Sequence, residues 1–113
     1  MTPKQELIKS STSSLLLSLL AEQPMYGYQI VKELESRSQG YFKFKEGTLY
    51  PALHRLEKAG LIVGTWQEVS SGRQRRYYRI TAQGEARLLQ DQNHWESFYA
   101  AIMMIMRPGT SRV

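Results

Sequence analysis

The sequence predicts a mainly α-helical (α+β) fold in which three helices precede a two-stranded β hairpin and one long helix follows it. Apolar residues recur at helical spacing in three segments before residue 60. Between residues 61 and 80 the pattern changes to β-branched and aromatic residues on both sides of a polar stretch containing Gly72, which is typical of a hairpin. A further helical pattern begins at Thr81 and ends before Pro108.

The composition fits one small domain with an appendage. A chain of 113 residues with 42% hydrophobic content can bury one modest core, and without cysteine it has neither disulfides nor thiolate chemistry. Packing, helped by oligomerisation, must then stabilise it. The longest aliphatic run, residues 15–20, is interrupted by Ser18 and is far shorter than the roughly 20 residues of a membrane span. We expect a cytoplasmic protein with no membrane partner.

The first two helices are delimited by Pro24 and Gly40. Leucine and isoleucine residues at mostly helical spacing predict a helix over residues 4–22, which stops before Pro24. A second helix is predicted from about Tyr26 to Ser38, and Gly40 ends it. The segment 41–44 alternates aromatic and basic side chains, so it is either a short strand or a loop anchored by its rings.

The third helix is the best defined, because its apolar residues fall within one arc at about 100° per residue. Its opposite face carries Gly47, Pro51, His54 and Lys58, flanked by Tyr50 on one side and Arg55 on the other. Proline is tolerated in the first turn of a helix, so Pro51 predicts a start near Thr48 with a small, polar N-terminus open to phosphate. Gly60 is a natural C′ residue that predicts the end of the helix.

The predicted hairpin has strands over residues 61–69 and 75–80, joined by the segment 70–74 with a basic tip. Together with the third helix it holds the net charge of the chain. Residues 43–79 contain eight basic and three acidic side chains, and this difference equals the whole-chain net charge of +5. Charge confined to two neighbouring elements is typical of a protein that docks on phosphates, so duplex DNA is the first expectation.

The last helix carries an apolar stripe that predicts a partner. Its apolar residues recur at intervals of seven on one track, with a second track that Asp91 interrupts once, and the predicted dimer-interface residues are Leu88, Trp95, Phe98, Ile102 and Ile105. A long amphipathic helix cannot cover this stripe on a three-helix core alone, so homodimerisation is the simplest expectation. The segment 108–113 is expected to be a disordered tail.

Three helices followed by a basic hairpin is the order of a winged helix-turn-helix, in which the third helix enters the major groove and the hairpin, or wing, follows the DNA backbone. We therefore predict a DNA-binding domain over residues 1–80 and a dimerisation helix over residues 81–107. Two-fold symmetry would present two recognition helices about one DNA turn, roughly 34–36 Å, apart on a pseudo-palindromic operator. The residues expected to contact DNA are Lys43, Lys45, Thr48, Tyr50, Pro51, His54, Arg55, Lys58, Arg73, Arg75 and Arg76.

Other interpretations of the basic stretch stay open at this point. Lysine and arginine are exposed in most proteins, so the charges could form a solvated surface. A winged helix that contacts an acidic protein would bind DNA weakly and without sequence preference. An enzyme, a metal site or a bound cofactor has little support, because His54 and His94 lie far apart and no Gly-rich phosphate loop precedes a helix. RNA fits poorly, since its A-form major groove is too narrow for a helix.

Several motifs together resemble the PadR-like transcriptional regulators. The residues that carry the resemblance are Tyr26-Gly27-Tyr28-Gln29-Ile30, Gly47-Thr48-Leu49-Tyr50-Pro51-Ala52-Leu53, Arg55-Leu56-Glu57-Lys58-Ala59-Gly60-Leu61-Ile62, Arg75-Arg76-Tyr77-Tyr78 and Thr81-Ala82-Gln83-Gly84. The similarity covers residues from about 12 to 90, and the combination is more specific than any one piece. The single terminal helix resembles the short subclass of this family.

The resemblance implies a winged-helix DNA-binding domain with a C-terminal dimerisation helix, acting as a repressor. It places the recognition helix at residues 48–59 and the wing tip at Arg73 to Arg76. It also leaves two roles open for Trp95, because multidrug-binding relatives have a tryptophan at the matching position. Either a small, flat aromatic effector is sandwiched between Trp95 and its symmetry mate, or Trp95 simply packs in the dimer contact, which is the commoner role of aromatic residues at helical spacing.

Overall fold

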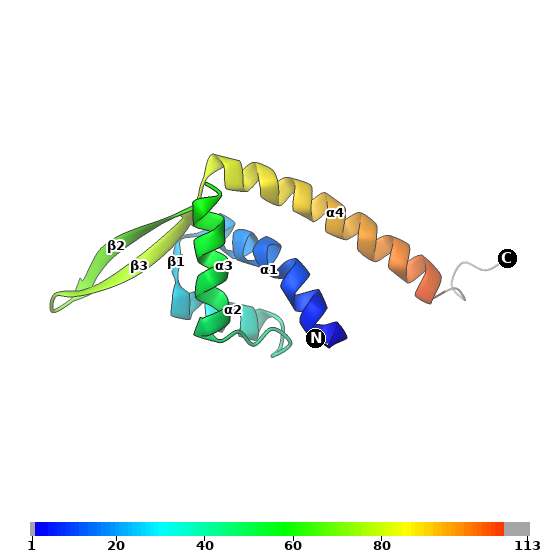
Figure 1. Cartoon of the computed structure of the whole chain (residues 1–113), viewed down its shortest axis with the longest axis horizontal. Helices are drawn as coiled ribbons and strands as arrows, with labels where there is room; N and C mark the ends of the chain where they lie inside the picture. The colour runs from blue at the N-terminus through cyan, green and yellow to red at the C-terminus, as the bar shows by residue number, and fades with distance from the viewer. Residues whose placement is uncertain (1, 108–113) are drawn as a thin grey trace.

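The computed structural model describes residues 2–107 and has a winged helix-turn-helix architecture, as expected from the sequence. Its elements are α1 (Pro3–Glu22), β1 (Met25–Tyr26), α2 (Gly27–Arg37), α3 (Glu46–Lys58), β2 (Ile62–Ser70), β3 (Arg73–Ile80) and α4 (Ala82–Met106). In Figure 1, β2 and β3 project as a hairpin to the left of the helices, and α4 leaves the same junction toward the right. The predicted tail, residues 108–113, lies outside the described residues. Within residues 2–107, no helix is long and apolar enough to cross a membrane.

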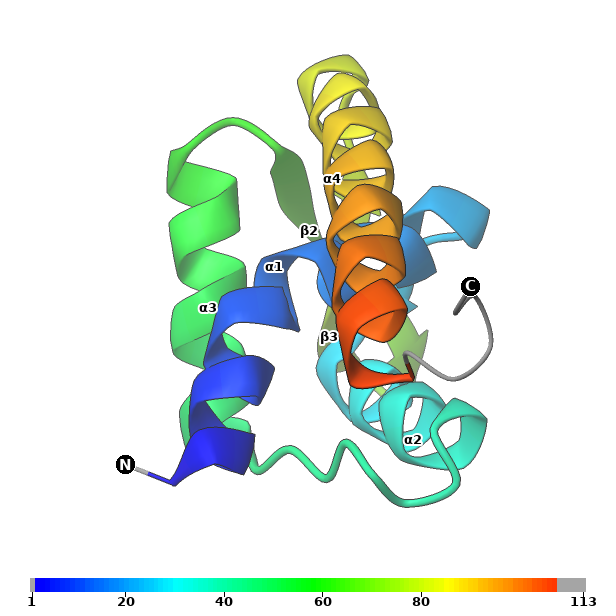
Figure 2. The same cartoon turned by 90° about the vertical axis from the view of Figure 1, so that its right-hand side faces the viewer.

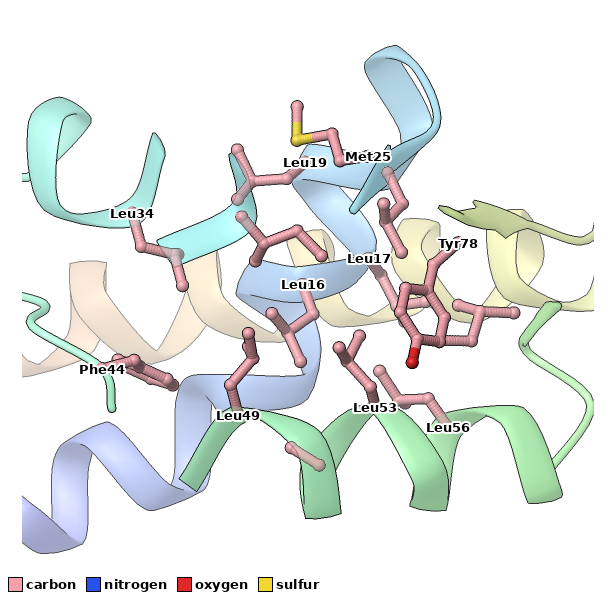
Figure 3. Close-up of a cluster of buried hydrophobic side chains, with 14 of the residues drawn as sticks. Leu16, Leu17, Leu19, Met25, Leu34, Phe44, Leu49, Leu53, Leu56 and Tyr78 are labelled. Carbon is pink, nitrogen blue, oxygen red and sulfur yellow. The ribbon is translucent and has the colours of Figure 1, made fainter. Parts of the chain in front are cut away.

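Part of the hydrophobic core lies where α3 packs against α1. Leu49 and Leu53 of α3 point toward Leu16 and Leu17 of α1, and all four side chains have no exposed surface (Figure 3). Burying a leucine side chain stabilises a fold by about 1.5–3 kcal/mol, so this contact fixes the position of α3. The opposite face of α3 is left to the surface.

The sheet holds one strand that the sequence does not predict. Its order is β1-β3-β2, and β1 pairs Met25 with Tyr78 and Tyr26 with Tyr77 in antiparallel register. The predicted second helix, from about Tyr26 to Ser38, is confirmed as α2, because Tyr26 and Ser38 are its N-cap and C-cap, but the pairing of Tyr26 in β1 is not predicted. A two-residue strand is too short to show alternation, and only its pairing with β3 defines it.

The wing turn is tighter than predicted. β2 and β3 are joined by Ser71 and Gly72 alone, whose φ angles of 48° and 79° are both positive. Two consecutive positive φ angles are typical of a type I′ turn, which matches the twist of a two-stranded hairpin. The predicted loop over residues 70–74 is therefore too wide, and Arg73 is the first residue of β3. The segment 41–44 is a loop, not a strand, and its Phe44 is buried.

The predicted start of the recognition helix near Thr48 is also wrong. The helix α3 begins at Glu46, so Pro51 lies in its second turn. The missing N–H of Pro51 leaves the carbonyl of Gly47 without its helical donor, and the exposure of Gly47 lets water replace it. The predicted end is confirmed: Gly60 has a φ of 80°, and the Leu61 N–H donates to the Leu56 carbonyl at 3.0 Å, as in a Schellman motif.

Candidate nucleic-acid interface

The exposed face of α3 carries the residues that the sequence predicts for DNA contact. Pro51, His54 and Lys58 are exposed, and Thr48 and Arg55 lie exposed on the flank nearer to α1. A helix of about 10–12 Å diameter fits a major groove roughly 12 Å wide, so this face can reach base edges. Arg55 can donate bidentately to guanine.

Tyr50 lies on the other flank of α3 and has a partly structural role. Its hydroxyl packs against the backbone of Gly27, where a Cβ atom would overlap it. Tyr50 is still 42% exposed and lines a pocket of about 550 Å³ at the root of the wing, together with Tyr28 and Trp66. Tyr28 and Trp66 are not predicted from the sequence as surface residues beside α3, because they lie on α2 and β2 and only the packing of these elements brings them to this helix.

Two lysines precede α3 and lie beside a third that the prediction missed. Lys43 and Lys45 are exposed in the loop before α3. With Arg55 they line a groove of about 720 Å³ between α1 and α3, and Lys9 of α1 lines the same groove. Lysine is common on the exposed side of any helix, so no local pattern marks Lys9 as part of a site.

The wing arginines divide into two kinds. Arg73 is exposed and directly follows the turn, so it can reach a phosphate or the minor groove. Arg75 is half-buried, and its guanidinium lies 3.9 Å from the centroid of the Tyr26 ring. This cation–π contact orients Arg75 without neutralising its charge.

Arg76 is engaged within the protein. Its Nη2 donates to Oε2 of Glu57 at 2.7 Å, and the same oxygen accepts from the Gly64 N–H at 3.0 Å. The guanidinium also lies near the rings of Trp66 and Tyr78, at 5.5 and 5.7 Å from their centroids. Arg76 therefore connects the root of the wing to α3, and of the predicted wing tip only Arg73 adjoins the turn.

Glycine at position 64 makes this connection possible. A Cβ atom there would stand 2.6 Å from Nε of Arg76, so a larger residue would displace the guanidinium.

The two tyrosines of β3 pack at the root of the wing. Tyr78, which pairs with Gly64 across the sheet, is buried, and this burial raises the pKa of its hydroxyl against the opposing effect of Arg76. Tyr77 packs edge-on against Tyr26 with 5.4 Å between ring centroids. The paired tyrosines of β3 thus form the packed root of the wing.

The predicted dimer residues are not all alike. Leu88 is buried in the core of its own chain, whereas Phe98 and Ile105 are 53% and 77% exposed. Trp95 and Ile102 are half-buried. The residues on the last half of α4 thus leave an apolar surface uncovered.

Trp95 is held in place by α1. Its indole N–H donates to Oγ of Ser14 at 3.2 Å, and the Ser14 hydroxyl donates to Oδ2 of Asp91 at 2.8 Å. Asp91 also accepts from Nε of Arg87 at 3.2 Å, so the residue that interrupts the apolar track anchors the tryptophan. Trp95 and Leu88 line a mainly apolar pocket of about 580 Å³ between α1 and α4.

The two histidines are both exposed and lie on different helices, His54 on α3 and His94 on α4. Among residues 2–107, no group of three or more histidine, cysteine, aspartate or glutamate side chains is placed to hold a metal ion.

A comparison of the chain with known proteins identifies its family. A model of the transcriptional regulator PadR-like family matches residues 16–90. The chain belongs to this family. It is 34% identical over 99 residues to the transcriptional regulator Rv3488 of Mycobacterium tuberculosis, a match that covers 88% of this chain and 89% of that protein.

Solved structures of PadR-family and related regulators have the same fold. A transcriptional regulator from Clostridium thermocellum superposes with a TM-score of 0.80 at 36% identity, covering 86% of this chain and 94% of the other. A PadR family regulator from Eggerthella lenta gives 0.79 at 31% identity, covering 90% and 87%. PadR-family proteins are DNA-binding regulators of transcription, a role other than catalysis.

Proposed function

We propose that this PadR-family regulator is a repressor that binds a pseudo-palindromic operator as a homodimer. The observation that carries the proposal is the continuity of the exposed α3 face with a basic wing. Lys58 and Arg73 have no ion-pair partner among residues 2–107, whereas Arg76 is paired with Glu57. Uncompensated cations beside a helix that fits the major groove support DNA binding. Because it would bind the chromosome, its place of action is the cytoplasm.

The roles of individual residues form part of this proposal. On α3, Thr48, Pro51 and His54 would line the groove with Arg55 reading bases. Phosphates would be held by Lys43, Lys45, Lys58, Arg73 and Arg75. Repression follows if the bound protein excludes polymerase from a promoter. The test is in vitro transcription from a template carrying the upstream region of the gene: added protein should lower the transcript, and an unchanged or increased transcript would contradict repression.

The proposed dimer rests on the uncovered end of α4. Phe98, Tyr99, Met104, Ile105 and Met106 are all more than half exposed, which leaves an apolar surface that a second copy would cover. In Figure 1 this end of α4 extends beyond the other helices and strands. Two-fold pairing there would set two α3 helices on one side of a duplex.

Replacing Ile105 by Asp tests the dimer with little effect on the fold. The side chain is 77% exposed in one chain, so a carboxylate there stays hydrated in the monomer but would be buried in the dimer. We expect light scattering to give the dimer mass for the native chain and the monomer mass for Ile105→Asp. Asn93→Asp, which adds the same charge at another exposed position of α4, is the matched control. A dimer that survives Ile105→Asp would place the interface elsewhere.

The position of Trp95 supports a second part of the proposed function, namely that the regulator responds to a flat aromatic effector. Its ring lines the α1–α4 pocket, and its hydrogen bond to Ser14 fixes the orientation of the indole. A ligand that stacks on it should quench Trp95 fluorescence in a Trp66→Phe variant, which leaves one tryptophan. Saturable quenching that also weakens DNA binding would support the effector role. If no planar aromatic compound quenches the fluorescence, Trp95 is only a packing residue.

A further inference from the structure

The groove between α1 and α3 holds a cluster of cations that the predicted interface includes only in part. It is lined by Lys9 and Ser13 of α1, by Lys43 and Lys45 of the preceding loop, and by Thr48 and Arg55 of α3. Figure 2 shows α1 next to α3, and residues of both helices line the groove. Four cations thus converge, one from α1 and three from the distant stretch of sequence that forms α3 and the loop before it.

These charges are not compensated inside the protein. The carboxylates among residues 2–107 that form ion pairs do so with Arg37, Arg76 and Arg87, and none pairs with Lys9, Lys45 or Arg55. No described residue that lines the groove is acidic. Like charges held close together repel one another, so the groove is suited to a polyanion.

The position of the groove relative to α3 identifies that polyanion. The groove shares Thr48, Pro51 and Arg55 with α3, so it adjoins the exposed face of the helix. The wing lies on the other flank, where Arg76 contacts Glu57. A helix that fills a major groove about 12 Å wide has a DNA backbone strand on each flank. One strand would meet the wing, and the other would meet the α1–α3 groove.

We propose that the α1–α3 groove is a second phosphate-binding site for duplex DNA, in which Lys9 of α1 acts with Lys45 to hold the strand remote from the wing. Ser13 adds a hydroxyl that forms no hydrogen bond within the described chain, whereas Thr12 beside it donates to the Ile8 carbonyl at 2.6 Å. The inference rests on the proposed DNA-binding function. It extends the interface from the helix-turn-helix and wing to the first helix of the fold.

The test compares two lysines of α1 that differ in direction. Lys9 faces the groove, whereas the Lys4 ammonium lies 4.6 Å from the centroid of the Tyr41 ring, which lines the pocket on the α4 side. Both are exposed, so neither alanine variant should unfold, and thermal melts of both variants would check this. The readout is the dependence of DNA affinity on salt, measured by fluorescence anisotropy. Each lost phosphate contact should reduce the slope of log affinity against log salt by about 0.9.

We expect Lys9→Ala to lower the slope by roughly one unit per protomer, Lys9→Arg to restore it, and Lys4→Ala to leave it unchanged. Arg73→Ala, on the wing, separates this inference from the proposed function. If Arg73→Ala lowers the slope but Lys9→Ala does not, the α1–α3 groove carries no phosphate and the inference is overturned. If the native chain shows no salt dependence, the DNA-binding function itself fails.

Discussion

The contact between Glu57 and Arg76 gives the sharpest prediction, because it joins α3 to the wing. One carboxylate oxygen accepts from the Arg76 guanidinium at 2.7 Å and from the Gly64 N–H at 3.0 Å. Hydrogen bonds to charged groups stabilise a fold by about 1.5–3 kcal/mol, while fully exposed ion pairs contribute roughly 0–1 kcal/mol. The two side chains are 30% and 26% exposed, between these limits. We therefore expect a coupling energy of about 1–2 kcal/mol.

A double-mutant cycle measures that coupling. Glu57→Gln and Arg76→Gln keep most of the side-chain volume while removing one charge each, and the double variant removes both. Urea unfolding is followed by circular dichroism at one protein concentration, because association would otherwise change the apparent stability. Additivity within about 0.3 kcal/mol would refute the coupling.

In DNA-binding assays, Glu57→Gln distinguishes the positioning of the wing from a simple effect of charge. Glu57→Gln removes a negative charge beside the proposed DNA surface, so charge alone predicts tighter binding to every duplex. If the contact positions the wing, operator affinity should instead fall while non-specific binding rises. Tighter operator binding by Glu57→Gln would show that the wing does not depend on this contact.

Two further predictions concern close packing and base reading. Gly84 lies in the first turn of α4, where the Cβ atom of an alanine would overlap the carbonyl oxygen of Leu61. Gly84→Ala should therefore destabilise the fold by about 1–3 kcal/mol in chemical unfolding. Gly47→Ala, whose Cβ would meet nothing within 4 Å, is the control and should be neutral or stabilising. An equal loss in both variants would contradict the packing argument. In competition assays, Arg55→Ala should reduce the ratio of the affinity for operator DNA to the affinity for shuffled DNA. Arg73→Ala should weaken binding to both duplexes and leave this ratio unchanged. If Arg73→Ala lowered the ratio and Arg55→Ala did not, Arg73 would read bases and Arg55 would hold a phosphate.

The parts of the fold with a strong local signal follow from the sequence. The apolar arc of Leu49, Leu53 and Leu56 predicts α3. Gly60 predicts its end, because the residue after the C-cap of a helix commonly adopts a positive φ, which glycine tolerates best. The start of α3 is less determined, since Pro51 is tolerated one turn further into the helix than expected. The strand β1 has no local signal, because it exists only through its pairing with β3.

The candidate site divides in the same way. Sequence pattern assigns Arg55 and Lys58 to the exposed face of α3, because that face is fixed by the helical period. It cannot tell that Arg76 is paired with Glu57, since that contact spans the turn from α3 into the hairpin. Nor can it place Lys9 beside α3, which depends on how α1 packs. Tertiary contacts thus decide which of several similar cations remain available to DNA.

The most direct measurement is fluorescence anisotropy with duplexes tiled across the upstream region of the gene, with a shuffled duplex as control, at several salt concentrations. Five cations that the proposed function assigns to phosphates have no carboxylate partner among residues 2–107, namely Lys43, Lys45, Lys58, Arg73 and Arg75. At about −0.9 for each phosphate contact, the slope of log affinity against log salt should be about −4.5 per protomer. We predict tight binding to one pseudo-palindromic segment with such a slope. Equal, weak binding to every duplex would contradict it and would favour a winged helix that contacts an acidic protein.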